Sequence, residues 1–169
     1  MTEERTRGWG MFAIGWALAL LILTLLFNGY LSTRENPNRI GSLTERDGEL
    51  ILRPNAHGHY LVEGHLNGLA VTFLLDTGAT DIAVPQNIAS LAGLNPGTSI
   101  LVQTAAGTAT AQITQINRMT LGHLVFQDMR GIIIPSDDKT VLLGMSALRD
   151  LDFTQSDGTL SLKKPASSI

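Results

Sequence analysis

The uncharged stretch from Trp9 to Phe27 constrains this chain more than any other feature. Leu, Ile, Ala and Phe dominate these nineteen residues. As a helix, the segment from Trp9 to Tyr30 would rise roughly 31 Å, which is close to the thickness of a bilayer's hydrocarbon core. Its two terminal aromatic residues would then lie near the two membrane interfaces. We therefore expect residues 9–28 to form a transmembrane helix that contacts the lipid bilayer.

A cleaved signal peptide is the alternative for this segment. Its apolar region should be shorter, and a cleavage site of small residues should follow. The sequence from Phe27 to Ser32 contains no such Ala-x-Ala pattern, which favours an uncleaved anchor. Arg5 and Arg7 before the span nearly balance Arg34 and Arg39 after it. Because the tail of residues 1–8 is short, we expect it in the cytosol, in a single-pass protein of the inner membrane with a periplasmic or otherwise extracytoplasmic domain.

After the apolar stretch, the composition divides the remaining 141 residues into three parts. Residues 29–48 are polar and predict a linker with no core of its own. Residues 49–164 predict one all-β domain with one or two short helices, because short apolar runs alternate with turn signals. Residues 165–169 are a C-terminal tail. Within the domain, Asn67-Gly68 is a strong hairpin signal. The expected strands are 49–53, 59–66, 69–75, 82–84, 99–104, 108–116, 118–121, 124–129, 131–134, 141–144 and 159–163, and the expected helices start at Pro85 and at Ser146.

Composition excludes several classes of function. The formal net charge is −3 and no basic cluster is present, so we expect no nucleic-acid partner. The chain has no cysteine, which excludes disulfides, thiol nucleophiles and thiolate metal sites. Its four histidines, His57, His59, His65 and His123, show no metal-binding spacing, so we expect no metal and no cofactor. Ser146 lacks the context of a nucleophilic serine.

Asp76 stands at the end of the apolar run Val71 to Leu75 and is followed by Thr77 and Gly78. The run predicts a buried strand, and glycine lets the chain turn sharply and lets another group approach. An ionised carboxylate at the edge of a core is usually paired or used. The alternative is an ordinary turn that ends the strand, since Asp and Gly are common turn residues.

Several motifs together resemble the retropepsin-like (clan AA) aspartic proteases, and more narrowly their bacterial, membrane-anchored, single-lobe members. They occur in the family's order over roughly residues 49–163: Gly58-His59-Tyr60, Asn67-Gly68, Phe73-Leu74-Leu75-Asp76-Thr77-Gly78-Ala79-Thr80 and Val141-Leu142-Leu143-Gly144-Met145-Ser146. The resemblance implies a closed, barrel-like lobe. Met145 and Ser146 replace the Arg and Asn or Asp of the viral enzymes, so virus-like dimer contacts do not carry over.

The resemblance also implies roles for particular residues. Asp76 would be the catalytic aspartate, in a loop supported by Thr77, Gly78, Ala79 and Thr80. The Thr77 hydroxyl would brace the two active-site loops against each other, and Gly78 would permit their close approach. Leu143 and Gly144 would pack beneath the Asp76 loop. The hairpin of Ala105, Ala106 and Gly107 would be the flap over a bound polypeptide, although its tip lacks the more usual Asn-Gly.

Hydrolysis of this kind needs two carboxylates around one water, one ionised and one protonated. The chain has one Asp-Thr-Gly, and Asp137-Asp138 lacks a flanking strand and is better explained as a solvated loop. We therefore expect a homodimer in which each copy supplies one Asp76. Ile82, Val84 and Ile134 could line pockets or belong to the core, which is the commoner role of such residues.

The sequence thus predicts a membrane-anchored aspartic endopeptidase. Two alternatives from other classes stay open. One is a peptide-binding or adaptor module on the same fold, because a fold does not determine a function. The other is a structural membrane protein whose soluble domain only assembles with partners.

Overall fold

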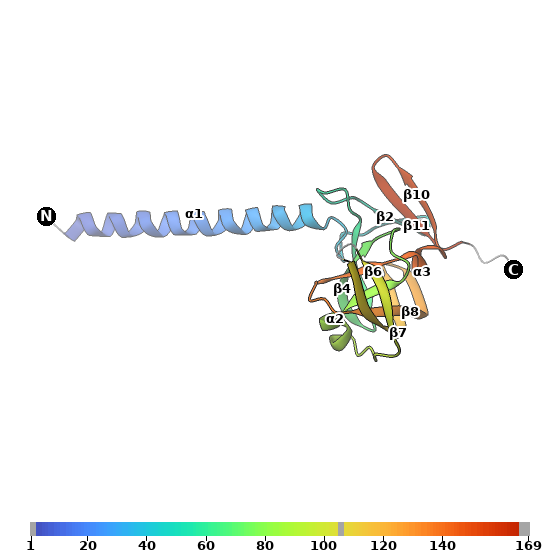
Figure 1. Cartoon of the computed structure of the whole chain (residues 1–169). Helices are drawn as coiled ribbons and strands as arrows, with labels where there is room; N and C mark the ends of the chain where they lie inside the picture. Colours follow the sequence, from blue (N-terminus) through green and yellow to red (C-terminus); the bar gives the residue numbers. More distant parts are fainter. Residues whose placement is uncertain (1–2, 105–106, 166–169) are drawn as a thin grey trace. The chain divides into compact units, whose positions relative to one another are not determined.

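The computed structural model describes residues 3–104 and 107–165. The chain divides into two compact units, one that ends at Glu35 and one that begins at Asn36. The first unit is the helix α1 (Glu3–Glu35). Within the described residues, the second holds all the strands and two short helices, most of which are labelled in Figure 1. The mostly-β domain expected from the sequence is therefore confirmed.

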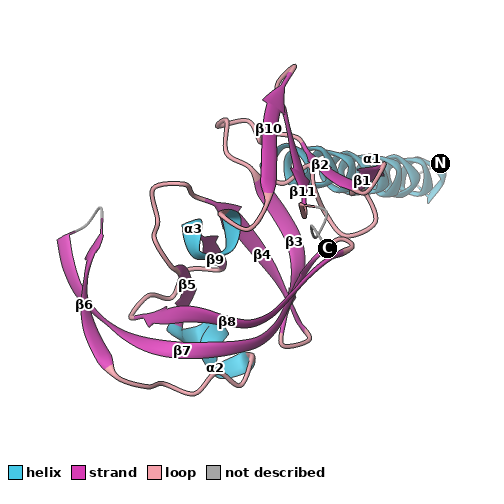
Figure 2. Ribbon diagram, turned by 90° about the vertical axis from the view of Figure 1, so that its right-hand side faces the viewer, coloured by secondary structure: helices cyan, strands magenta, loops and turns pink. Residues whose placement is uncertain are grey.

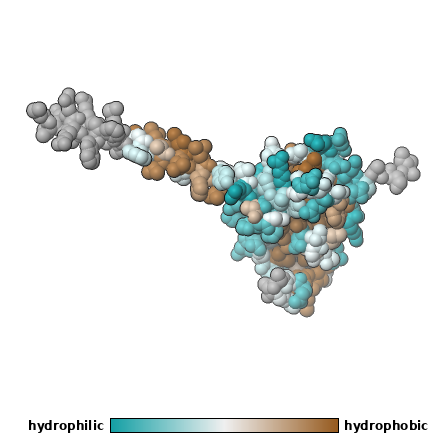
Figure 3. Space-filling view, turned by 90° about the horizontal axis from the view of Figure 1, so that it is seen from above, coloured by the Kyte–Doolittle hydropathy of each residue, from teal (hydrophilic) through white to brown (hydrophobic). Residues whose placement is uncertain are grey.

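From Ile14 onward, the helix α1 exposes its large apolar side chains. Trp16 is 71% exposed and Leu26 is 67% exposed. Figure 3 shows a brown, hydrophobic surface along part of this helix. The stretch Ile14–Glu35 is long and apolar enough to cross a membrane. Because water does not favour such a surface, this helix fits either a membrane anchor or a signal sequence. It extends past the expected residues 9–28 at both ends.

The expected linker, residues 29–48, differs from the structure over most of its length. Residues 29–35 continue α1, and residues 44–46 form the strand β1 (Thr44–Arg46). Between these elements, Asn38 is only 3% exposed. Its Nδ2 donates to the carbonyl oxygens of Arg53 and Leu61, each at 2.7 Å, and its Oδ1 accepts from the Arg53 N–H at 2.8 Å. Asn38 and the rest of residues 36–48 therefore belong to the folded domain.

In the part of the chain that the structure describes, eleven strands form two sheets, which Figure 2 shows as magenta arrows. The four-stranded sheet has the order β1-β2-β11-β10, and the seven-stranded sheet has the order β3-β4-β9-β5-β8-β7-β6. A further pairing joins β3 to β7, so the pairings return to β3. The remaining strands are β2 (Glu49–Leu52), β3 (Leu61–Leu66), β4 (Leu69–Leu75), β5 (Ile82–Pro85), β6 (Ser99–Thr104), β7 (Gly107–Leu121), β8 (Leu124–Ile134), β9 (Thr140–Leu143), β10 (Asp152–Ser156) and β11 (Thr159–Lys163).

The main core is built from side chains of these strands, in which buried and more exposed residues alternate. In β4, Val71 and Phe73 are buried while Ala70 is exposed, which is the period of two expected of a half-buried strand. Ile82 and Val84 of β5 are fully buried, so they belong to the core rather than to a pocket. The helix α2 (Gln86–Leu91) contributes Ile88 to the same core.

Most expected elements are confirmed, and the differences have physical causes. Asn67 and Gly68 both have positive φ (49° and 88°), as the tight β3–β4 hairpin requires. Pro85 ends β5 and precedes α2 instead of starting it. The expected strand pairs 108–116 with 118–121 and 124–129 with 131–134 are single long strands, because β7 and β8 pair in one register from Gln112–Ile133 to Leu121–Leu124. The helix α3 is shorter than expected (Met145–Leu148), and β10 was not predicted.

Candidate active site

Asp76 follows β4, where that strand runs parallel to β9. Leu75 is in register with Leu143, and the Asp76 N–H donates to the Leu143 carbonyl oxygen at 3.1 Å. The Asp76 Oδ1 accepts from the Gly78 N–H at 2.8 Å. The Ala79 N–H donates to the Asp76 carbonyl oxygen at 3.2 Å. These bonds fix a tight turn in which the carboxylate orders its own loop.

Gly144 lies against the backbone that follows Asp76. A Cβ at this glycine would collide with the Asp81 carbonyl oxygen and would lie 2.8 Å from that of Ala79. The two residues after Gly144 bond the same segment, since the Met145 N–H donates to Ala79 O and the Ser146 N–H to Thr80 O, each at 2.8 Å. Only a glycine leaves room for this contact. The structure thus brings the two sequence motifs together.

The loop's outer residues reach solvent in the single chain. Thr77, Gly78 and Thr80 are exposed, whereas Asp76 and Ala79 are partly buried. Among the residues that the structure describes, the ion pairs use other carboxylates, namely Glu45, Glu49, Glu63, Asp81 and Asp150. The Asp76 carboxylate is therefore available as a hydrogen-bond acceptor or as a base, and one such group alone does not make a dyad.

The residues expected to form a flap fall on the hairpin of β6 and β7. Ala105 and Ala106 lie outside the described residues. Gly107 has a φ of 113°, which favours glycine, and its carbonyl oxygen accepts from Thr104 Oγ1 at 2.7 Å. Next to the turn, Thr108 Oγ1 donates to Gln103 Oε1 at 3.0 Å. The two strands of the hairpin are thus bonded to each other up to the pair Thr104 and Gly107.

A small second apolar cluster lies between this hairpin and the strands beside the Asp76 loop. Ala83 of β5, Ala111 of β7 and Ile132 of β8 are its buried members. Its partly buried members are Ile100, Val102, Ile134 and Leu142. Leu142 belongs to β9, two residues before Gly144. In this cluster, apolar side chains of the β6–β7 hairpin therefore lie next to those of the strands beside the Asp76 loop.

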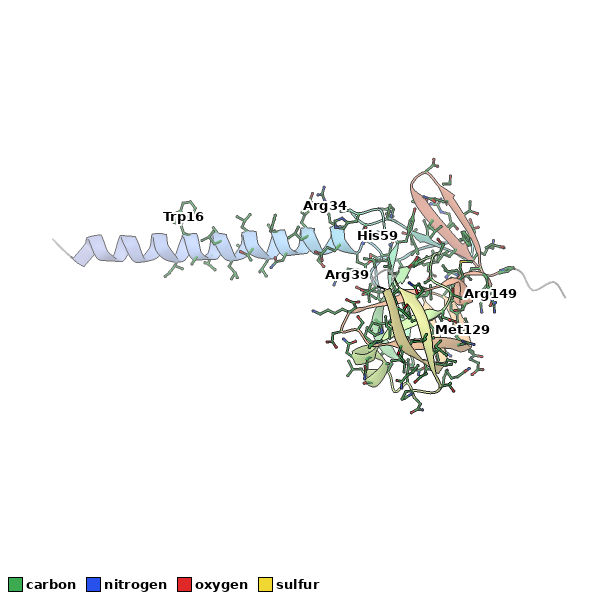
Figure 4. All side chains as sticks on the ribbon, viewed as in Figure 1. Trp16, Arg34, Arg39, His59, Met129 and Arg149 are labelled. Carbon is green, nitrogen blue, oxygen red and sulfur yellow. The ribbon has the colours of Figure 1, made fainter. Side chains whose placement is uncertain are left out.

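A pocket of about 580 Å³ adjoins the loop at Thr80 and Asp81. Met129 and Arg149, which Figure 4 labels, both line it. Arg130 lines it as well, and its Nε lies 3.7 Å from Asp81 Oδ1. Sequence reasoning missed this ion pair, because Arg130 is 49 positions away from Asp81 and no local pattern links the two.

The other candidates from the sequence do not join the site. His57 and His59 have ring centroids 6.4 Å apart, and His123 binds Glu45 and the Gly48 carbonyl oxygen. Within residues 3–104 and 107–165, no group of three or more His, Asp or Glu side chains could hold a metal ion. Asp137 and Asp138 are exposed, and their carbonyl oxygens accept from Asn87 Nδ2.

A family model and a solved structure both relate this chain to the same kind of protein. The family described as "gag-polyprotein putative aspartyl protease" matches residues 62–150. A solved structure described as a retropepsin-like aspartic protease from Rickettsia conorii is similar, with 28% identity and a TM-score of 0.58 over 68% of this chain and 90% of the other.

Two curated proteins are also similar. One is an uncharacterized protein of Sinorhizobium, 29% identical over 70% of this chain and 54% of its own length. The other is an uncharacterized protein of Rickettsia prowazekii, 29% identical over 60% of this chain and 45% of its own length. The chain thus spans about half the length of these relatives.

Proposed function

Because this chain belongs to the family of retropepsin-like aspartic proteases, we propose that it is an aspartic endopeptidase that hydrolyses peptide bonds in polypeptides. The observation that carries the proposal is the Asp76 loop. Its carboxylate is ordered by the Gly78 N–H, and its backbone is held against Gly144. We assign Asp76 as the catalytic residue and the segment from Thr77 to Thr80 as its support. Leu143 and Gly144 supply the second motif.

The proposed reaction uses two copies of Asp76 and one water. One carboxylate is ionised and takes a proton from the water, whose oxygen bonds to the carbonyl carbon of the substrate. The other is protonated and donates a hydrogen bond to the carbonyl oxygen. The C–N bond then breaks, and a proton passes to the leaving amine. Two carboxylates about 3 Å apart share one proton readily, because both cannot ionise together.

We propose that the second carboxylate is the partner's Asp76 in a homodimer. The strand β10 offers a contact surface for this assembly. It lies at the edge of its sheet, and all five of its residues are exposed. Gln155 of β10 donates to the Tyr60 hydroxyl at 3.2 Å, and the Tyr60 carbonyl oxygen accepts from the Leu75 N–H next to Asp76. An open edge so close to the loop suits pairing with a second copy.

We further propose that the flap hairpin, with Ala105, Ala106 and Gly107 at its turn, covers a bound peptide. The second apolar cluster would then contact substrate side chains, which favours apolar residues beside the cleaved bond. We also propose that the ring of strand pairings closes into the single-lobe barrel expected from the sequence.

For localisation, we propose that α1 is an uncleaved anchor in the inner membrane, with the β domain on the extracytoplasmic side. Anchoring two copies in one bilayer raises their effective concentration, so a weak contact would be enough to assemble the dyad.

The deciding experiment compares Asp76→Asn with the wild type. We expect the variant to fold and to lose peptide cleavage, because a neutral amide cannot take the proton from water. Asp137→Asn is the matched control, since it removes the same charge from an exposed loop and should leave cleavage unchanged. Both proteins would be tested as full-length chains on an unbiased peptide library from pH 4 to 7.

Two results would change this assignment. Cleavage by Asp76→Asn at the wild-type rate would refute the mechanism. Peptide binding without turnover by the wild type at every pH, with the dimer present, would favour the peptide-binding or adaptor module on the same fold.

A further inference from the structure

A groove on the β domain combines two exposed apolar side chains that the proposed reaction does not use. Leu91 of α2 is 75% exposed and Ile40 is 49% exposed. Both line a pocket of about 460 Å³ whose other apolar walls are Leu69, Ala70, Val71 and Ile88. We call Ile40, Leu69 and Leu91 the Ile40–Leu91 patch, and the buried Ile88 forms the floor of the groove. Adjacent exposed apolar residues on a soluble domain commonly mark a contact surface.

Ile40 is held in place at this surface. Its N–H donates to Glu63 Oε2 at 3.0 Å, and the Arg39 Nε donates to Glu63 Oε1 at 3.2 Å. The buried Asn38, two residues before Ile40, is bonded to the backbone of Arg53, just after β2, and of Leu61 in β3. Ordered hydrogen bonds therefore keep an apolar side chain at the surface, and it cannot turn inward without breaking them.

The length of chain between this patch and α1 indicates what covers it. The proposed span, residues 9–28, ends twelve residues before Ile40. Residues 29–35 continue α1 and rise about 10 Å as a helix, and five extended residues then reach at most about 18 Å. If α1 spans a bilayer, as proposed above, Ile40 stays within about 28 Å of the bilayer surface. A lipid surface is then the partner present at the highest local concentration.

The charges around the patch are mixed. The groove is lined by cationic Lys139 and anionic Glu63. Arg39 bonds Glu63, and Asp137 and Asp138 bond the groove residue Asn87 through their carbonyl oxygens. Because the cations do not dominate, anionic lipid would give little attraction, and burial of apolar surface has to supply the binding. From these observations we propose that the Ile40–Leu91 patch inserts into the interfacial region of the bilayer to which α1 anchors the domain.

This docking would set the height of the proposed catalytic site. The wall of the groove on β4 runs from Leu69 to Thr72, and Asp76 lies four residues beyond Thr72. Four residues at about 3.3 Å each separate these two positions by roughly 13 Å. The Asp76 loop would thus stay outside the lipid-contacting groove but close to it, which suits substrates whose cleaved bond lies near the bilayer surface.

The chain has no cysteine, so a single introduced cysteine can report on each position. We would reconstitute the full chain in phosphatidylcholine vesicles, with an environment-sensitive fluorophore on Leu91→Cys. The matched control is Leu101→Cys, because Leu101 on β6 is similarly exposed at 77%. We expect blue-shifted emission at position 91 that is quenched by nitroxide-labelled phosphatidylcholine, and neither effect at position 101.

Each other outcome overturns the proposal in a distinct way. Vesicles that carry the chain but leave the probe at 91 unquenched would refute docking and keep the anchor. A blue shift at 91 without lipid quenching would mean that protein covers the patch. A chain that does not float with the vesicles would refute anchoring and docking together. Peptide cleavage by the same samples tests the proposed function separately.

Discussion

At the scale of single residues, Gly144 has little room for change. Its missing Cβ is what lets the backbone of β9 approach the loop that follows Asp76. In Gly144→Ala, the added methyl would push away the carbonyl oxygens of Ala79 and Asp81, which are backbone atoms and cannot rotate aside. We expect a loss of about 1–3 kcal/mol in the free energy of unfolding, as is typical of overpacking. Cleavage should fall as well, because the displaced loop carries the proposed catalytic group.

Urea denaturation and a peptide-cleavage assay would measure both effects of Gly144→Ala. Gly29→Ala is the control, since a Cβ at Gly29 meets no atom within 4 Å. An unchanged midpoint and rate for Gly144→Ala would contradict the close contact described here.

Asn38 is the second residue with a strong local consequence. Asn38→Ala removes the side chain that bonds the backbone of Arg53 and Leu61, and leaves those groups without their partner. We expect a stability loss of about 1–3 kcal/mol. Asn117→Ala is the control, because Asn117 is exposed. Equal denaturation midpoints for the two variants would show that Asn38 does not hold the start of the domain.

Gly144 and Asn38 also show how far prediction from sequence reaches. Asp76 and Gly144 were identifiable because an apolar strand precedes each of them. Asn38 was not, because a buried asparagine and a solvated one look alike in a polar stretch. Its partners are 15 and 23 residues further along the chain, and only the folded backbone reveals them.

At the scale of elements, an acidic side chain joins β2 to β11. The Ser161 hydroxyl donates a hydrogen bond to the Glu49 carboxylate, and Lys163 Nζ lies 3.6 Å from it. The Ser161 hydrogen bond has the largest effect and lowers the pKa of Glu49 in the folded chain; desolvation opposes it, and the charge and hydrogen bond of Lys163 lower the pKa further. This pairing therefore stabilises the fold above the usual glutamate pKa of about 4.3, and the stabilisation is lost as the pH falls through the lowered value.

The test of this link is Glu49→Gln. We expect the variant to be less stable than the wild type at pH 7 and to lose less stability on acidification. Urea midpoints measured between pH 7 and pH 3 would show the two curves converging. Asp137→Asn should follow the wild-type curve instead. If the Glu49→Gln curve stayed parallel to the wild type at all pH values, the Ser161 and Lys163 contacts would not contribute.

Strand boundaries were the least predictable part of the fold. Asn117 and Arg130 are polar and were expected to interrupt two strands. Instead β7 and β8 run through these positions, because the two strands pair with each other in the same register before and after them. Long-range pairing of this kind overrides local preference. The strand β10 escaped prediction for a related reason, since its five residues are all exposed and show no alternation of burial.

At the scale of the whole molecule, the proposed dimer predicts a specific cross-link. If β10 pairs antiparallel with a second β10 about Thr154, then Asp152 faces Ser156 and no like charges meet. Thr154→Cys would place two thiols opposite each other. We expect it to form a disulfide-linked dimer under mild oxidation and to retain cleavage.

Thr110→Cys is the control for this cross-link, because Thr110 is exposed on β7. Cross-linking at position 110 and not at 154 would place the subunit contact elsewhere. Cleavage that stays proportional to enzyme concentration at every dilution, with no loss as dimers dissociate, would contradict a dyad shared between two chains.

The parallel pairing of β4 with β9 has a consequence for the time at which activity can arise. Residue 72 is in register with residue 140, so the loop after β4 has no fixed neighbour until the second motif has been synthesised. Contacts between such distant positions form late and slowly, because a long stretch of chain must first be closed into a loop. A partly made chain would therefore hold Asp76 in an unformed turn. On the ribosome, the proposed activity would therefore be absent until the segment that contains Gly144 has emerged.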